Sequence, residues 1–395
     1  MLNIKSIITS KPTDSIKDTI TYLEPDIVRI YIDVKNAART LFIPEVMDEL
    51  LTASKPNQIN SVIFQGLLYY AAWWKFYLMH LNVKSEIIFF SDVGISTIYH
   101  KNISKDYKLQ REQSQQTSGA LENDFAILYR ANLDLAEKII NKLPTMYYVK
   151  LKNLESDFVP HFCKTRVFTK NEKAFNIICS GDKDMFQLLD DNTMMVFKQN
   201  NTDYSIGKHD AIKYYFKSEG DEKLSKKIEK INPDWIVSIM SLVGDSIDNV
   251  KGLHRFGIKK AADIFSNDAV TEALFGGSPT AHQKLILETD SYFPDTKDLD
   301  KEAEKLKVGK SLIEAVGGDD TIIKNAYKLI SYEALCKDLE KKDSPSKIRI
   351  INQFYNIFNT TGEDIMESST VLIDILQKNL KDLQLTKDHI EALFY

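Results

Sequence analysis

The chain of 395 residues is poor in cysteine and contains no long apolar run. Its three cysteines, Cys163, Cys179 and Cys336, are odd in number and far apart in the sequence. They provide neither a disulfide framework nor a zinc-ligand pattern, which favours a reducing compartment. No segment reaches about 18 consecutive apolar residues, and the N-terminus lacks the apolar stretch of a signal peptide. We therefore expect a cytoplasmic protein without a membrane partner.

An excess of positive charge is also missing. The chain has 51 Lys and Arg residues against 56 Asp and Glu residues, which gives a net charge of −5. No global basic field attracts nucleic acid, so any binding of nucleic acid must use local basic patches. The hydrophobic content of 43% and the charged content of 27% are ordinary for a soluble globular protein. The length allows two domains, or one large domain with an appendage.

Four hydrophobic strands are predicted, and acidic residues follow each of them along the chain. The strands are expected at Ile27 to Val34, Glu86 to Phe90, Met146 to Val149 and Phe175 to Cys179. The acids at or just beyond their ends are Asp33, Asp92, Glu155 with Asp157, and Asp182 with Asp184. Helical segments separate the strands, so the pattern predicts an α/β fold with a central, mostly parallel sheet. The carboxyl ends of parallel strands share one edge, where we expect these acids to gather.

A long insertion separates the second and third predicted strands, at about residues 94–143. It begins with basic residues that include Lys108 and Arg111, continues through the polar tract QREQSQQTSG, and becomes helical. About fifty residues are too many for one packed loop. We interpret the insertion as a helical arch over the acidic edge of the sheet. The alternative is a disordered surface insertion.

The stretch from Gly244 to Phe265 combines acids, glycines and lysines in one supersecondary unit. Asp245 and Asp248 are three residues apart, a spacing that lets both carboxylates face one cation. A turn containing Gly252 and Gly257 follows, and then a helix that opens with Lys259 and Lys260. A turn with outward N–H groups beside a basic helix start is a site for a nucleic-acid phosphate. The stretch therefore indicates phosphodiester chemistry, with a capped helix and solvated lysines as the alternative.

In order and spacing, these residues resemble the flap endonuclease and 5′→3′ exonuclease superfamily. The similarity is greatest to the bacteriophage 5′-nuclease branch (phage RNase H type) and the bacterial polymerase-associated branch. It covers about residues 27–266 and rests on Asp33 with Asn36 and Arg39, Asp92, Tyr107-Lys108 with Arg111, Glu155 with Asp157, SGDKD at 180–184 and GDSIDN at 244–249. The resemblance implies a PIN-like 5′-nuclease fold with a helical arch and, at about 244–266, a helix–three-turn–helix.

The resemblance also implies a role for each of these residues. Two Mg²⁺ ions, replaceable by Mn²⁺, are expected at two clusters: Asp33, Asp92, Glu155 and Asp157 at the first, and Asp182, Asp184, Asp245 and Asp248 at the second. Lys108 and Arg111 of the arch are expected at the scissile phosphate, with Tyr107 stacking on a base. Nucleic-acid contacts are expected from Arg39, Tyr107, Lys108, Arg111, Gly252, Arg255, Gly257, Lys259 and Lys260. In that family the turn often binds a potassium ion as well.

The implied function is a structure-specific, metal-dependent 5′ nuclease that acts at 5′ flaps or ends of DNA in replication or repair. Its partner is a duplex with a 5′ single-stranded end, and its place is the cytoplasm, or the host cytoplasm for a phage-encoded protein. One alternative is an RNase H-type nuclease that removes RNA primers from RNA–DNA duplexes. A second is a non-catalytic protein that binds DNA structures and keeps a degenerate metal site.

Several residues depart from the family's pattern: Tyr99 or His100 stands where the family usually has an arginine, and Lys251 stands where it often has proline. Phe158 stands where the family commonly has an acid, which puts the affinity of the first metal cluster in question. Arg255 stands where the family often has glycine. A residue with a side chain adopts a positive φ only at a cost, so we expect the turn to be rebuilt around Arg255.

We expect three segments along the chain: a lead-in at 1–26, the catalytic domain at 27–266 and a C-terminal helical region at 267–395. The last region has no chemical motif. It is expected to pack against the catalytic core and to extend the duplex-binding surface. An alternative is that its apolar tail, Glu391 to Tyr395, binds a replication partner such as a sliding clamp or a single-stranded-DNA-binding protein.

Overall fold

The computed structural model describes residues 13–41, 56–93, 97–110, 113, 133–134, 136–152, 154–168, 172–199, 202–217, 221–288, 321–341, 357–358 and 392–393. The chain divides into two compact units. Unit 1 comprises Met1–Ser96, Ser118–Ile206 and Leu339–Tyr395, and unit 2 comprises Thr97–Thr117 and Gly207–Asp338. Each unit is described separately below.

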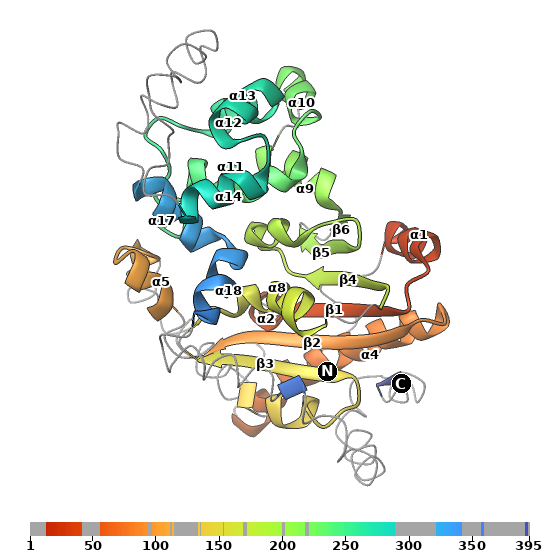
Figure 1. Ribbon diagram of the computed structural model, residues 1–395. Helices are drawn as coiled ribbons and strands as arrows, with labels where there is room; N and C mark the ends of the chain where they lie inside the picture. Colours follow the sequence, from red (N-terminus) through yellow and green to blue (C-terminus); the bar gives the residue numbers. More distant parts are fainter. Residues whose placement is uncertain are drawn as a thin grey trace. The chain divides into compact units, whose positions relative to one another are not determined.

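Unit 1 is built on a six-stranded sheet. Its strands are β1 (Ile27–Asp33), β2 (Lys84–Val93), β3 (Met146–Lys152), β4 (Ala174–Cys179), β5 (Thr193–Gln199) and β6 (Thr202–Ile206). They are ordered β3-β2-β1-β4-β5-β6, and only β6 runs antiparallel to its neighbour (Figure 1). The prediction of an α/β fold with a central, mostly parallel sheet is thus confirmed, and β6 is a strand that the sequence reasoning missed.

Both faces of this sheet are buried, as the continuous apolar strands predict. Val28, Ile30 and Ile32 of β1 lie in one hydrophobic core, whereas Tyr31 between them is buried outside that core. The first core also takes residues from α1 (Asp14–Leu23) and the long α4 (Pro56–His80). Three aromatic residues of α4, Phe64, Tyr70 and Trp74, are buried in this core, and Tyr69, Trp73 and Tyr77 are partly buried against it.

Short helices follow the carboxyl ends of the strands in unit 1. They are α2 (Val34–Leu41) after β1, η2 (Ser156–Phe158), α8 (Val159–Phe162) and η3 (Cys163–Val167) after β3, and η4 (Lys183–Leu188) after β4. Each connection is short, so the residues that leave a strand stay close to the edge of the sheet. This arrangement places the predicted acids at the start of these helices.

Unit 2 is helical in the part that the structure describes. Its helices are α5 (Ile98–Ile103), α9 (Lys208–Phe216), α10 (Glu222–Ile228), η5 (Pro233–Trp235), α11 (Ile236–Val243), α12 (Ile258–Phe265), α13 (Asp268–Phe275), α14 (Pro279–Glu288), α17 (Thr321–Ile330) and α18 (Tyr332–Glu340), whose last two residues belong to unit 1.

An aromatic cluster fixes these helices to one another. The ring of Trp235 lies 5.3 Å from that of Phe265 and 5.9 Å from that of Phe275, measured between centroids. Phe275 also contacts the buried His282, whose Nδ1 lies 2.6 Å from the Ser238 hydroxyl. Burial lowers the pKa of His282 to about 3, so the imidazole is neutral and packs as part of the core. The cluster holds α11 and α12, and with them the two ends of the turn that joins these helices.

The two units do not divide the chain at residues 26 and 266. The lead-in contributes Ile16 and Ile20 of α1 to the core of unit 1. The C-terminal α17 packs against α11 and α5 within unit 2. Leu393 of the predicted docking tail is fully buried in the core of unit 1, so a partner that binds this tail would have to release it. Among the described helices, none is both long and apolar enough to cross a membrane.

Candidate active site

A chain of hydrogen bonds links the ends of β1 and β4 in unit 1. Asp33, the last residue of β1, is buried and accepts the backbone N–H of Asn36 at 3.0 Å and the hydroxyl of Ser180 at 3.0 Å. The same hydroxyl oxygen accepts the backbone N–H of Asp182 at 3.2 Å. Asp182 then caps η4, because its carboxylate accepts the N–H of Asp184 at 3.0 Å. These bonds hold acids of two neighbouring strands at one edge of the sheet.

A second set of bonds ties β2 to the segment after β3. Asp92 accepts the backbone N–H of Ser156 at 2.6 Å. Ser156 begins η2, and Glu155 and Asp157 flank it on either side. Glu155 is buried and Asp157 is half-buried. The carboxylate of Asp92 therefore fixes the position of the turn that carries two further acids.

Neighbouring carboxyl groups of unit 1 oppose the ionisation of Asp33 and Asp157. The pKa of Asp33 is raised to about 6, chiefly by burial and also by the charges of Asp182 and Asp92, while the hydrogen bonds from Asn36 and Ser180 act to lower it. The pKa of Asp157 is raised well above its usual range, first by burial and then by the charges of Asp92, Asp182, Asp33 and Glu155. We call Asp33, Asp92, Glu155, Asp157 and Asp182 the acidic cluster.

The acidic cluster has the donors that a hard divalent cation requires. All its ligand atoms are carboxylate oxygens, which suit Mg²⁺ or Mn²⁺ better than softer metals. A cation would relieve the repulsion that raises the pKa values of Asp33 and Asp157. Phe158, which stands where the family has an acid, is buried and packs edge to face on Phe162 at 6.1 Å. Its side chain thus contributes to the hydrophobic core.

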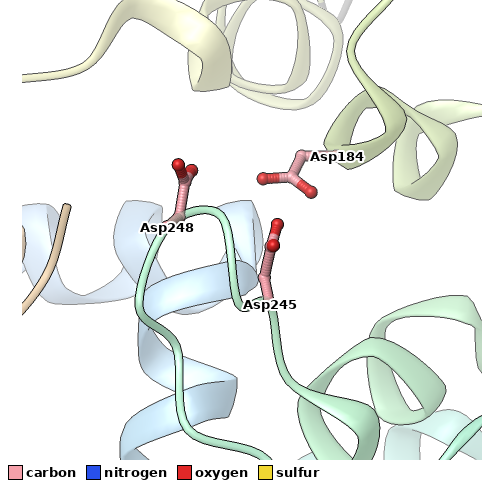
Figure 2. A group of neighbouring side chains, drawn as sticks. All are labelled: Asp184, Asp245 and Asp248. Carbon is pink, nitrogen blue, oxygen red and sulfur yellow. The ribbon is translucent and has the colours of Figure 1, made fainter. Parts of the chain in front are cut away.

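In unit 2, Asp245 and Asp248 lie on the turn that follows α11, and both side chains point to the same side of it (Figure 2). Asp245 and Val250 exchange two backbone hydrogen bonds, at 2.9 and 2.7 Å, and the Asp245 carboxylate accepts the N–H of Ile247 at 2.8 Å. These bonds give the turn one defined shape. Asp184, also drawn in Figure 2, belongs to η4 of unit 1.

Two glycines permit the backbone of this turn to close on itself. Gly244 has φ +75°, and a Cβ there would lie 2.3 Å from the Gly252 nitrogen. A Cβ on Gly252 would lie 2.1 Å from the Val243 carbonyl oxygen. Such distances are far below contact distance, so glycine is required at both positions. By contrast, Gly257 has φ −114°, with nothing within 4 Å of a Cβ built on it.

The predicted arch residue Lys108 also lies against this turn, and Tyr107 precedes it in the chain. The Lys108 Nζ is 3.3 Å from the Asp248 carboxylate, and both side chains are 13% exposed. The ring of Tyr107 is buried and stacks on His100 with 4.8 Å between centroids. Stacking of Tyr107 on a base, as the resemblance implies, would therefore require this ring to leave His100.

The remaining predicted contacts lie on the turn and on α12. Arg255 is exposed and adopts φ 56°, so the chain accepts a left-handed arginine where the family often has glycine. Its strain is of the order of 1 kcal/mol. Lys259 is largely exposed, 3.8 Å from Asp221, and Lys260 is half-buried. Arg111 and the side chain of Arg39 lie outside the described residues.

Sequence comparisons find relatives among nucleases, although no family model matches the chain. A 5′-3′ exonuclease of Mycoplasmopsis pulmonis is 23% identical over 50% of this chain and 56% of its own length. One of Buchnera aphidicola is 26% identical over 47% of this chain and 55% of its own length. DNA polymerase I of Bacillus caldotenax is 20% identical over 74% of this chain and 31% of its own length. The chain thus spans about half the length of the two exonucleases.

The solved structures decide the fold. The zinc-bound T5 5′-exonuclease matches with a TM-score of 0.53 and 12% identity over 85% of this chain and 99% of its own. The chain shares the fold of the T5 5′-exonuclease. A bacteriophage T5 flap endonuclease variant, in a product complex with DNA and metal ions, matches with a TM-score of 0.53 and 14% identity over 85% of this chain and the whole of its own. Together with the relatives named 5′-3′ exonuclease, this shared fold confirms the resemblance that the sequence predicts.

Sequence reasoning missed two polar residues that stand beside the predicted acids and make long-range hydrogen bonds. Ser180 bridges Asp33 and Asp182, and Asn249 donates from its side chain to the Asp106 carbonyl oxygen at 3.0 Å. Both stand inside the motifs SGDKD and GDSIDN that carry the resemblance. Their position beside the acids was the sequence signal that could have identified them. Their partners Asp33 and Asp106 are distant in sequence, so the bonds themselves could not be predicted.

Proposed function

We propose that this protein is a metal-dependent 5′ nuclease that hydrolyses phosphodiester bonds at 5′ ends or flaps of DNA. The observation that carries the proposal is the acidic cluster, in which separate connections of one sheet bring five carboxyl groups within electrostatic reach of each other. A cluster of this kind costs folding free energy unless cations fill it. The relatives named 5′-3′ exonuclease and the metal-bound T5 structures support the same chemistry.

The donors fit two Mg²⁺ ions, for which Mn²⁺ can substitute. We assign the first ion to Asp33, Asp92, Glu155 and Asp157. A second ion, with Asp182, Asp184, Asp245 and Asp248 as its ligands, stays a prediction from the resemblance. When bound, such ions activate a water molecule and stabilise the departing oxygen. A potassium ion at the turn after α11 is a further proposal, on the resemblance alone.

The other residues of the site bind and orient the nucleic acid. Lys108 brings a positive charge beside Asp248, where it would approach a phosphate held at the acids. The turn after α11 and the start of α12, with Lys259 and Lys260, would hold the duplex backbone. Contacts to the backbone carry no base information, so we expect the enzyme to recognise structure and not sequence.

Substitution of Asp182 by Asn tests the proposal. A 5′-labelled flap duplex is incubated with Mg²⁺, and cleavage is measured next to duplex binding. We expect the variant to lose at least about 100-fold in cleavage rate, because a metal ligand is lost, while its duplex affinity changes by less than about threefold. The matched control is Asp18→Asn, which removes an exposed acid from α1. Full cleavage by Asp182→Asn would show that the acidic cluster is not the catalytic centre.

The same assay separates the alternatives. Flaps of identical geometry made of DNA or carrying a 5′ RNA segment report which strand is preferred. Metal titration by calorimetry tests the non-catalytic reading, because a degenerate site would bind neither Mg²⁺ nor Mn²⁺. A sliding clamp or a single-stranded-DNA-binding protein as partner stays a prediction.

A further inference from the structure

Residues 104–110 form the first end of the expected arch. Within unit 2 they are hydrogen-bonded to the turn that carries Asp245 and Asp248, which we call the acidic turn. The Lys108 N–H donates to the Asp248 carbonyl oxygen at 2.9 Å. The next residue on that turn, Asn249, donates from Nδ2 to the Asp106 carbonyl oxygen at 3.0 Å. Two neighbouring residues of the turn therefore bind two nearby residues of the arch segment.

The arch segment takes an unusual backbone conformation between these contacts. Lys108 has φ 53°, a left-handed conformation that costs a lysine of the order of 1 kcal/mol. The Asp106 carbonyl oxygen also accepts the Leu109 N–H at 3.1 Å, so it closes the turn around Lys108. The side-chain amide of Asn249 thus donates to the same Asp106 carbonyl oxygen that closes the backbone turn containing Lys108. Strained residues persist where their surroundings hold them.

The result is a fixed position for the Lys108 side chain. Its Nζ lies 3.3 Å from the Asp248 carboxylate and 5.1 Å from the centroid of the Tyr107 ring, and the side chain is 13% exposed. Asn249 itself has φ 59°, which asparagine tolerates better than most residues. Asparagine therefore meets both requirements of position 249: it tolerates the positive φ, and its side chain donates the hydrogen bond to Asp106.

We propose that Asn249 is a positioning residue that holds Lys108 beside Asp248 for the cleavage step. This inference rests on the proposed nuclease function. The inference adds to that function that the acidic turn and residues 104–110 act as one structural element. The side chain of Asn249 joins them, and it is proposed neither as a metal ligand nor as a contact of the reacting atoms. The competing explanation is that Asn249 only stabilises its own turn.

The first test needs no cleavage. Asn249→Gly removes the amide and keeps the positive φ accessible. In EDTA, we expect hydrogen exchange at the Lys108 and Leu109 amides to become about fivefold faster, as expected for the loss of one hydrogen bond. The control is Asn267→Gly, because Asn267 makes its side-chain bond to Ala269 at the start of α13 in the same unit. Unchanged exchange at Lys108 in Asn249→Gly would overturn the inference.

The second test asks whether Asn249 acts through Lys108. In single-turnover cleavage of a 5′ flap, we expect Asn249→Gly to be about tenfold slower with an unchanged dissociation constant for duplex. The double variant Asn249→Gly/Lys108→Ala should be no slower than Lys108→Ala alone. If the rate losses of the two single variants multiply in the double variant, Asn249 does not act through Lys108 and the proposal is refuted. If the wild-type protein does not cleave flaps, the nuclease function fails, and the exchange experiment still decides the contact.

Discussion

The carboxyl group of Asp33 lies where burial and neighbouring charge oppose its ionisation. Its pKa is raised to about 6 in the folded, metal-free protein, against about 4 in an unfolded chain. A raised carboxyl pKa means that stability is lost as the pH rises from about 4 to about 6. Asp33→Asn removes this loss. In EDTA, we therefore expect the free energy of unfolding of the variant minus that of the wild type to be about 2 kcal/mol larger at pH 8 than at pH 4.

Urea unfolding at the two pH values measures this difference. Asp18→Asn serves as the control, since Asp18 is exposed on α1 and its replacement should change stability by less than about 0.5 kcal/mol at either pH. A gain for Asp33→Asn that is equal at pH 4 and pH 8 would contradict the assigned environment of Asp33.

Glycine at position 244 is a second requirement at the scale of one residue. Gly244→Ala would put a methyl group 2.3 Å from the Gly252 nitrogen at φ +75°. We expect a loss of more than about 2 kcal/mol in the free energy of unfolding, because the methyl group meets backbone atoms that have no room to move. Gly257→Ala is the matched variant and should change it by less than about 1 kcal/mol, as nothing lies within 4 Å of its Cβ. Equal losses in thermal or urea unfolding would show that the turn does not close as described.

At the scale of one element, α12 and the turn before it are expected to hold the duplex. Lys259→Ala/Lys260→Ala should weaken duplex binding and reduce the slope of log affinity against log salt by about 1 to 2, because up to two phosphate contacts are lost. Fluorescence anisotropy of a labelled duplex at several salt concentrations measures both effects.

The matched control removes the same charge from neighbouring helices. Lys213 of α9 and Lys223 of α10 are both exposed, so Lys213→Ala/Lys223→Ala separates a local contact from a general loss of charge. We expect the control to keep the slope of the wild type within about 0.5. A slope that is the same in both double variants would remove α12 from the nucleic-acid surface.

At the scale of the whole molecule, metal binding and folding should be linked. A ligand that binds only the folded state stabilises it by about 2.7 kcal/mol at 100 times its dissociation constant. We therefore expect saturating Mn²⁺ to raise the free energy of unfolding by a few kcal/mol over that in EDTA. Asp182→Asn should lose most of this gain, and the exposed Asp18→Asn should keep it. A wild-type unfolding curve unaffected by Mn²⁺ would show that the acids do not form a metal site in the folded protein.

Much of the acidic cluster was predictable, for a simple geometric reason. Parallel strands end at a common edge, so an apolar run such as Phe175 to Cys179 followed by acids places those acids there. The same logic did not predict β6, which carries alternating exposed residues and pairs antiparallel with β5. The positive φ of Arg255 was not predicted either, because the surrounding backbone overrides the conformational preference of one residue.

By itself, the sequence determined the four strands that lead to the acids, the order of the acids and the glycine-closed turn, because these depend on local pattern and spacing. The tertiary structure decided which distant groups meet. Ser180 joins Asp33 to Asp182, Asp92 holds the turn of Glu155 and Asp157, and Asn249 binds the segment of Lys108. Apart from the bond between Ser180 and Asp182, these contacts join residues that are 64 to 147 positions apart in the chain. Their partners depend on how the whole chain folds, and no local pattern contains that information.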